Sequence, residues 1–168
     1  MTQPPDHVDR IQQEWARERP DVDVRPQGVI GRLHRLGLAL GTEIAAVYRE
    51  HGLGEGEFDV LAALRRAGAP YERAPGDLAA HTMVTTGAMT KRVDRLVAAG
   101  LVTRRPSADD GRGRVVALTA RGVELVDAAF TAHMANERRL LDLLGPEADA
   151  AALEALLRRW LAAVEDRA

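Results

Sequence analysis

Cysteine is absent from the 168-residue sequence, and aromatic residues make up only 4% of it. Without a thiol the chain can form no disulfide, no thiolate zinc site and no cysteine-based redox sensor. Scarce aromatic residues beside abundant alanine and leucine favour packed helices over the β-branched and aromatic surfaces of sheets. We therefore expect a mainly helical protein, and the length suits a single domain with a sizeable core.

The residues that enzymes and metal sites need are also sparse. Ser107 is the only serine, it lies in no G-x-S-x-G motif, and no glycine-rich phosphate motif follows a predicted strand. The histidines are dispersed, without H-E-x-x-H or paired spacing: His7, His34, His51, His81 and His133. A small enzyme is the alternative these features disfavour, and we expect no catalytic residues, no cofactor and no metal site.

Long apolar runs are missing as well. No segment reaches the roughly 18 apolar residues of a membrane span. The first residues, MTQPPDHVDRIQQEW, are partly acidic and lack the continuous apolar run of a signal peptide. We expect a soluble cytoplasmic protein with no membrane partner.

Positive charge does not dominate the chain, but it gathers in one stretch. The formal net charge of the whole chain is −2. Between Val84 and Val116 there are seven basic and three acidic side chains, a net charge of +4 that leaves −6 for the remainder. The seven are Lys91, Arg92, Arg95, Arg104, Arg105, Arg112 and Arg114. Any binding to nucleic acid must therefore come from this local patch and not from bulk charge.

Apolar residues at helical spacing predict five helices in the first 100 residues. The first follows Asp6 as its N-cap, carries an apolar stripe that includes Trp15, and ends at Pro20. After a polar link over residues 21–26, a long second helix continues to His51.

Three shorter helices follow. One covers residues 57–67, and the next has Pro75 at its first position. The fifth helix takes Thr85 as its N-cap and closes at Gly100, where a left-handed residue is usual.

The pattern then changes to two β-prone segments, residues 101–105 and 114–119, joined by the Pro, Asp and Gly mixture of a hairpin loop. Thr119 caps a long helix, and Pro146 follows the break before a last helix. The expected order is five helices, a hairpin and two helices.

A helix, a tight turn, a second helix and a hairpin form the arrangement in which the second helix enters the major groove of DNA. At about 100° per residue, Met89, Val93, Leu96 and Val97 form one apolar seam on the fifth helix. The contact candidates are Thr85, Thr86, Gly87, Thr90, Lys91, Arg95, Arg112 and Arg114.

Small residues occupy the first turn of this helix, and long side chains that donate hydrogen bonds follow. A helix that reaches the edges of bases requires this order. Arg112 lies between glycines at the hairpin tip, where it can enter a minor groove and Asp110 can steady it. The alternatives are an ordinary solvated amphipathic helix and a solvated surface hairpin.

The segments EFDVLAALRRAG, MVTTGAMTKRVDRLVAAGLVTRR and DDGRG together resemble the winged helix-turn-helix of the MarR family of bacterial transcriptional regulators. The resemblance covers about Leu53 to Leu125 and implies a homodimer held by its N- and C-terminal helices. It also implies a pseudo-palindromic operator and, usually, repression that a small ligand releases.

On this resemblance the single domain divides into N-terminal helices (1–52), a DNA-binding region (53–119) and C-terminal dimerisation helices (120–168). One departure is Ala74, where the family more often has a capping Thr or Ser, at a cost of about 1 kcal/mol.

Arg92 is the basic residue of the fifth helix that the helical wheel places beside the apolar seam. A buried guanidinium needs a carboxylate or an anionic ligand, and Asp59 is a possible partner. A plain Arg–Asp bridge, or an arginine that reaches out to solvent, remains the alternative.

The resemblance extends to a urate-responsive branch of the family, which has an additional N-terminal helix bearing Trp. The branch's ligand-site positions are matched by Trp15, Asp59, Arg92 and Arg104. This implies an anion that displaces the aspartate, engages the arginines and shifts the DNA-reading helix.

Relatives in that branch answer to other anions, including citrate and aconitate, so an anionic metabolite is a broader expectation than urate itself. The pattern is also compatible with an aromatic carboxylate as the effector, or with a regulator that has no effector. Trp15 can equally be a core anchor.

Overall fold

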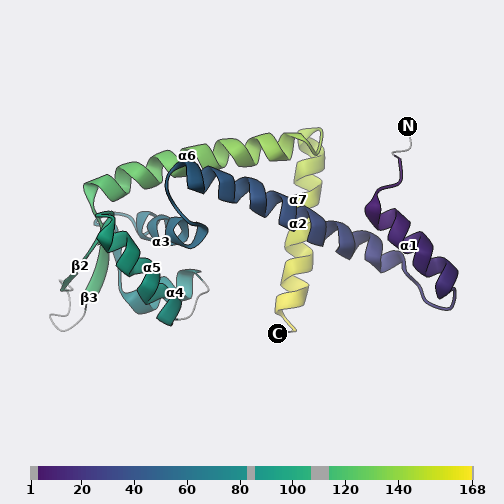
Figure 1. Ribbon diagram of the computed structural model, residues 1–168, viewed down its shortest axis with the longest axis horizontal. Helices are drawn as coiled ribbons and strands as arrows, with labels where there is room; N and C mark the ends of the chain where they lie inside the picture. Colours follow the sequence, from purple (N-terminus) through teal and green to yellow (C-terminus); the bar gives the residue numbers. More distant parts are fainter. Residues whose placement is uncertain (1–3, 83–85, 107–113, 168) are drawn as a thin grey trace. The chain divides into compact units, whose positions relative to one another are not determined.

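The computed structural model describes residues 4–82, 86–106 and 114–167, with the backbone alone at residues 81 and 86–88 (Figure 1). The chain divides into two compact units, residues 1–43 and residues 44–168. The three-part division expected from the sequence stays a prediction. None of the described helices is long and apolar enough to cross a lipid bilayer.

The first unit contains α1 (His7–Glu18) and most of α2 (Arg25–Glu50). The predicted N-cap is confirmed, because the Asp6 carboxylate accepts hydrogen bonds from the backbone N–H of Val8 at 2.7 Å and of Asp9 at 3.0 Å. Arg32 of α2 binds the carboxylates of Asp6 and Asp9 at 2.8 and 2.7 Å. These two ion pairs join the start of α1 to α2.

The polar link predicted over residues 21–26 is wrong at its end, since α2 already begins at Arg25. Pro26 is compatible with this start, because the first turn of a helix needs no backbone N–H from that residue. The start of this helix was predicted from the spacing of its apolar residues. Such spacing begins only where the helix packs against a neighbour, so it places the start too late when the first turn is polar.

The second unit starts with the last turns of α2, and its further elements carry the small sheet. They are α3 (Glu55–Arg65), β1 (Glu72–Arg73), α4 (Pro75–Thr82), α5 (Thr86–Ala98), β2 (Val102–Pro106), β3 (Arg114–Leu118), α6 (Ala120–Asp142) and α7 (Glu147–Glu165). The predicted fold class, mainly helical with a β-hairpin wing in a winged helix-turn-helix, is confirmed.

The sheet is antiparallel with the strand order β1-β3-β2. In the predicted hairpin, Thr103 of β2 is paired with Ala117 of β3, and Glu72 of β1 pairs with Ala117 from the other side. The sequence did not predict β1, because two residues are too short to show the alternation of a strand. An ion pair between Glu72 and Arg105 links the two outer strands.

The core of this unit lies where α3, α4 and α5 meet the sheet below one end of α6 (Figure 1). Its fully buried side chains include Leu61 and Leu64 of α3, Leu78 of α4 and Val116 of β3. Phe58 of α3 extends the core, since its ring stacks on that of Tyr48 with centroids 4.1 Å apart. Helix α5 packs against this core.

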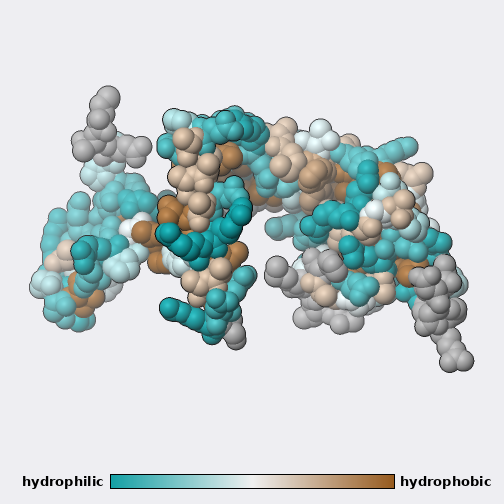
Figure 2. Space-filling view, turned by 180° about the vertical axis from the view of Figure 1, so that it is seen from behind, coloured by the Kyte–Doolittle hydropathy of each residue, from teal (hydrophilic) through white to brown (hydrophobic). Residues whose placement is uncertain are grey.

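Helix α7 has a different character, because none of its residues is buried. A space-filling view shows apolar atoms along its length (Figure 2). Its exposed large apolar side chains are Leu156, Leu157, Trp160, Leu161 and Val164. The described chain leaves this stripe in contact with water.

Candidate nucleic-acid interface and anion site

Helix α5 buries one face and exposes the other. Met89, Val93 and Leu96 are 1, 2 and 1% exposed, so this part of the predicted seam is confirmed. Val97 was placed in the seam wrongly, since it is 39% exposed. Its wheel angle lies about 80° from Met89, at the edge of the seam, whereas Met89, Val93 and Leu96 lie within about 60° of one another.

The other face of α5 presents Thr90, Lys91, Asp94 and Arg95, which are all exposed. Three of them are contact candidates from the sequence. These three candidates supply one hydroxyl and two cationic groups, and the opposite face of the helix is buried in the core. Such a surface is suited to donate hydrogen bonds to phosphates and base edges.

The remaining contact candidates lie around this face or outside the described residues. The backbone of Thr86 and Gly87 forms the first turn of α5, and Arg114 is exposed at the start of β3. Thr85, Arg112 and its suggested partner Asp110 lie outside the described residues.

Two ion pairs restrain arginines next to this face. Arg104 of β2 binds Asp94 of α5 at 2.6 Å, which ties the hairpin to the helix. Arg95 of α5 lies with its Nε 2.9 Å from Oε1 of Glu57 on α3. Sequence reasoning missed Glu57 as a partner, because its spacing from Gly54 indicates only the start of a helix.

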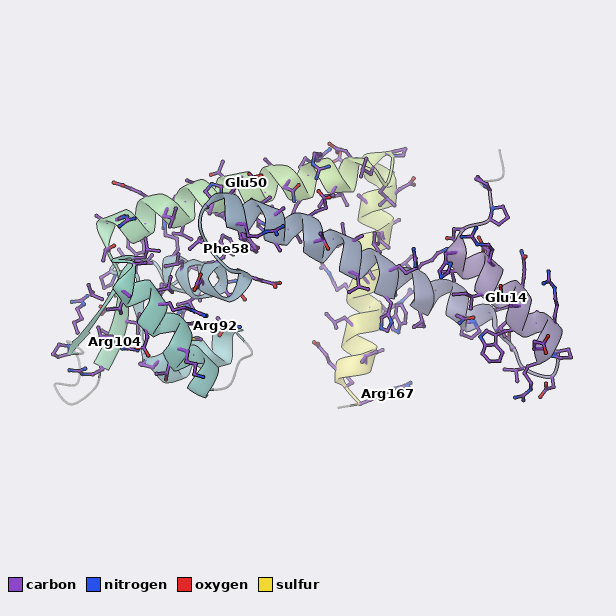
Figure 3. The ribbon with its side chains drawn as sticks, in the orientation of Figure 1. Glu14, Glu50, Phe58, Arg92, Arg104 and Arg167 are labelled. Carbon is purple, nitrogen blue, oxygen red and sulfur yellow. The ribbon has the colours of Figure 1, made fainter. Side chains whose placement is uncertain are left out.

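Arg92 leaves the exposed face and lies between α5 and α3 (Figure 3). Its guanidinium covers Gly56 so closely that a Cβ at that position would fall 2.6 Å from Nη2 and nearer still to Nε and Cζ. The Nη1 atom is buried and has no hydrogen-bond partner among the described residues. An inward, incompletely satisfied guanidinium is a candidate for binding an anion.

Asp59 lies on the same helix as Gly56, and no ion pair or hydrogen bond joins it to Arg92 within the described part of the chain. The plain Arg–Asp bridge considered from the sequence is therefore not formed there. Burial raises the pKa of the Asp59 carboxyl above its ordinary value, Glu55 raises it further, and Arg92 and Arg66 lower it only in part.

The four residues matched to a ligand site are not all in one unit. Asp59, Arg92 and Arg104 belong to the second unit, on α3, α5 and β2. Trp15 belongs to the first unit, on α1, and is 51% exposed. Within the residues described, no group of three His, Asp or Glu side chains is placed to hold a metal ion.

Comparison with known proteins identifies the family to which this arrangement belongs. A sequence model of the MarR family matches residues 51–113. The HTH-type transcriptional regulator PecS of Dickeya dadantii is 40% identical over 154 residues, which are 90% of this chain and 91% of PecS. The chain belongs to the MarR family. It is a transcriptional regulator of the MarR type and not an enzyme.

Two further MarR-type proteins bear on the site. A mutant MarR from E. coli, solved in complex with operator DNA, is 27% identical with a TM-score of 0.68, over 83% of this chain and 99% of that one. The Mycobacterium tuberculosis repressor Rv2887 is 34% identical over 71% of this chain and 82% of its own sequence. Its structure with p-aminosalicylic acid has a TM-score of 0.61 and covers 79% of this chain and 97% of that one.

Proposed function

We propose that the protein binds double-stranded DNA as a homodimer at a pseudo-palindromic operator and represses transcription there, in the cytoplasm. The observation that carries this proposal is the exposed face of α5. Thr90, Lys91 and Arg95 lie on it, opposite a seam packed into the core. The chain outside the basic stretch is acidic, so this face is where DNA would be attracted.

The dimensions of α5 suit the major groove. Its 13 residues make a helix of roughly 20 Å, and the groove admits one helix. The hairpin strands are tied to this helix through Asp94 and Arg104, so Arg114 would reach the adjoining DNA backbone. The operator complex of the related MarR and the repressor Rv2887 support the same role for this chain.

The homodimer rests on the apolar stripe of α7. Five large apolar residues on one helix, each at least 40% exposed, form more apolar surface than a monomer usually leaves in water. A second copy would cover it by a twofold axis, so that two α5 helices meet two half-sites of a palindrome.

The effector we propose is an anionic metabolite such as urate. Arg92 would bind it through its unsatisfied Nη1, with Arg104 as a further contact. Trp15, which belongs to the other unit, stays a predicted contact. Asp59 would be displaced, at little cost, because its carboxylate is half-buried without an ion-pair partner in the described chain and its pKa is already raised. The anion would then favour a pose of α5 with lower affinity for DNA.

An aromatic carboxylate is the second candidate effector, and the p-aminosalicylate complex of Rv2887 favours it. The third alternative is a DNA-binding regulator that responds to no effector. In that case Arg92 would be a purely structural residue of the α3–α5 contact.

The experiment is a fluorescence anisotropy titration of a duplex from the protein's own upstream region, against a scrambled duplex of equal length. We expect a preference for the upstream duplex and lower affinity at higher salt. The complex is then titrated with urate, citrate and p-aminosalicylate. Equal binding of both duplexes would disprove operator recognition, and no response to any anion would disprove the effector.

A further inference from the structure

The carboxylate of Glu57 contacts both the start of its own helix, α3, and an arginine of α5. Its Oε2 accepts a hydrogen bond of 2.9 Å from the backbone N–H of Gly54, which closes the first turn of α3. Its Oε1 lies 2.9 Å from Nε of Arg95 on α5. The Glu57 side chain is 19% exposed and that of Arg95 is 66% exposed. Glu57 is therefore the fixed partner, and Arg95 reaches from it into solvent.

We propose that Glu57 is a positioning residue that gives α5 its sequence specificity through Arg95. This inference rests on the proposed function, in which α5 enters the major groove. An arginine bound at Nε keeps the donors of its two Nη atoms, and its planar guanidinium can no longer rotate freely. Those donors are the ones that pair with two acceptors on a guanine edge.

Glu57 acts on DNA binding in two opposite ways. Its negative charge next to Arg95 reduces the attraction to any duplex, which depends on charge and not on sequence. Its hold on Nε fixes the orientation of the guanidinium, on which contacts to base edges depend. The pair therefore weakens non-specific binding and strengthens specific binding, so its effect is largest in the ratio of the two affinities.

The substitution Glu57→Gln separates these roles from folding. Glutamine serves in a capping box as glutamate does, so the hydrogen bond from Gly54 is kept while the ion pair with Arg95 is lost. Glu55→Gln is the matched control. It removes one negative charge from the same helical turn, and Glu55 makes no ion pair with α5 within the described residues.

The readout is the ratio of the affinities for the upstream and the scrambled duplex. We expect Glu57→Gln to lower this ratio by about tenfold for each protomer of the dimer, which is the loss of one good base contact per half-site. We expect Glu55→Gln to raise both affinities and leave the ratio unchanged. In an Arg95→Ala background, Glu57→Gln should change the ratio no further.

A Glu57→Gln variant with the wild-type ratio would overturn the proposal, and so would an effect that persists without Arg95. If Glu57→Gln does not fold, Arg95→Gln tests the same pair, and a wild-type ratio for it would be equally decisive. A wild-type protein with no preference between the duplexes would overturn the proposed function itself, before any variant is compared.

Discussion

The contact between Arg92 and Gly56 gives the sharpest prediction about the anion site. In Gly56→Ala the new Cβ would lie 2.6 Å from Nη2 of Arg92, whereas carbon and its neighbours pack at about 3.5 to 4.0 Å. The guanidinium must therefore move by about 1 Å or more. Because it is the end of a flexible side chain with an unsatisfied Nη1, it can move toward water at little cost in folding stability.

The expected cost falls on ligand binding instead. A hydrogen bond between a guanidinium and an anion contributes about 1.5 to 3 kcal/mol, and each 1.4 kcal/mol is a factor of ten. We therefore expect Gly56→Ala to need at least about tenfold more urate to release the operator. The melting temperature should stay close to that of the wild type, since alanine favours a helix by up to about 1 kcal/mol over glycine.

The assay is the displacement of a labelled operator by urate, followed by anisotropy. Gly76→Ala is the matched control, because Gly76 is also the second residue of its helix and an added Cβ there meets nothing within 4 Å. A Gly56→Ala variant that responds to urate like the wild type would refute the role of Arg92. A wild-type protein without a response to urate would refute urate as the effector.

Two further predictions concern stability. Asp59→Asn should raise the melting temperature at pH 7, because the Asp59 pKa is raised in the fold and its ionised form destabilises the native state. The difference in melting temperature between the variant and the wild type should vanish as the pH falls through the folded pKa to the ordinary value of 3.8. A difference that stays constant in a pH series of thermal melts would contradict this. Gly122→Ala should destabilise by about 3 kcal/mol in urea denaturation, since its Cβ would meet the backbone carbonyl of Leu101, whose carbon would be 3.0 Å away. A variant as stable as the wild type would show that the contact between α6 and the backbone at Leu101 is loose.

Elements with strong local signals could be predicted from the sequence. Asp6 and Thr119 cap their helices as expected, because a hydrogen-bonding side chain before an apolar run is a local feature. The seam of α5 was predicted at Met89, Val93 and Leu96 for the same reason, since helical geometry alone brings them together.

The features that were missed depend on residues far apart in the chain. Strand β1 forms only because Glu72 and Arg73 find a partner in β3. The pairing of Arg95 with Glu57 and the packing of Arg92 on Gly56 depend on how α5 crosses α3, which no spacing within either helix reveals. The sequence therefore predicts candidate contact residues, but it does not reveal the carboxylates that restrain Arg95 and Arg104.

The most direct test of DNA recognition by α5 is the salt dependence of operator binding, measured for the wild type and for Lys91→Ala. Lys91 is exposed on α5 and makes no ion pair within the described residues. Each phosphate contact contributes about 0.9 to the slope of log K against log salt, so a dimer that loses two should have a slope smaller by about 2. A salt-independent affinity, or the same slope for both proteins, would contradict the account.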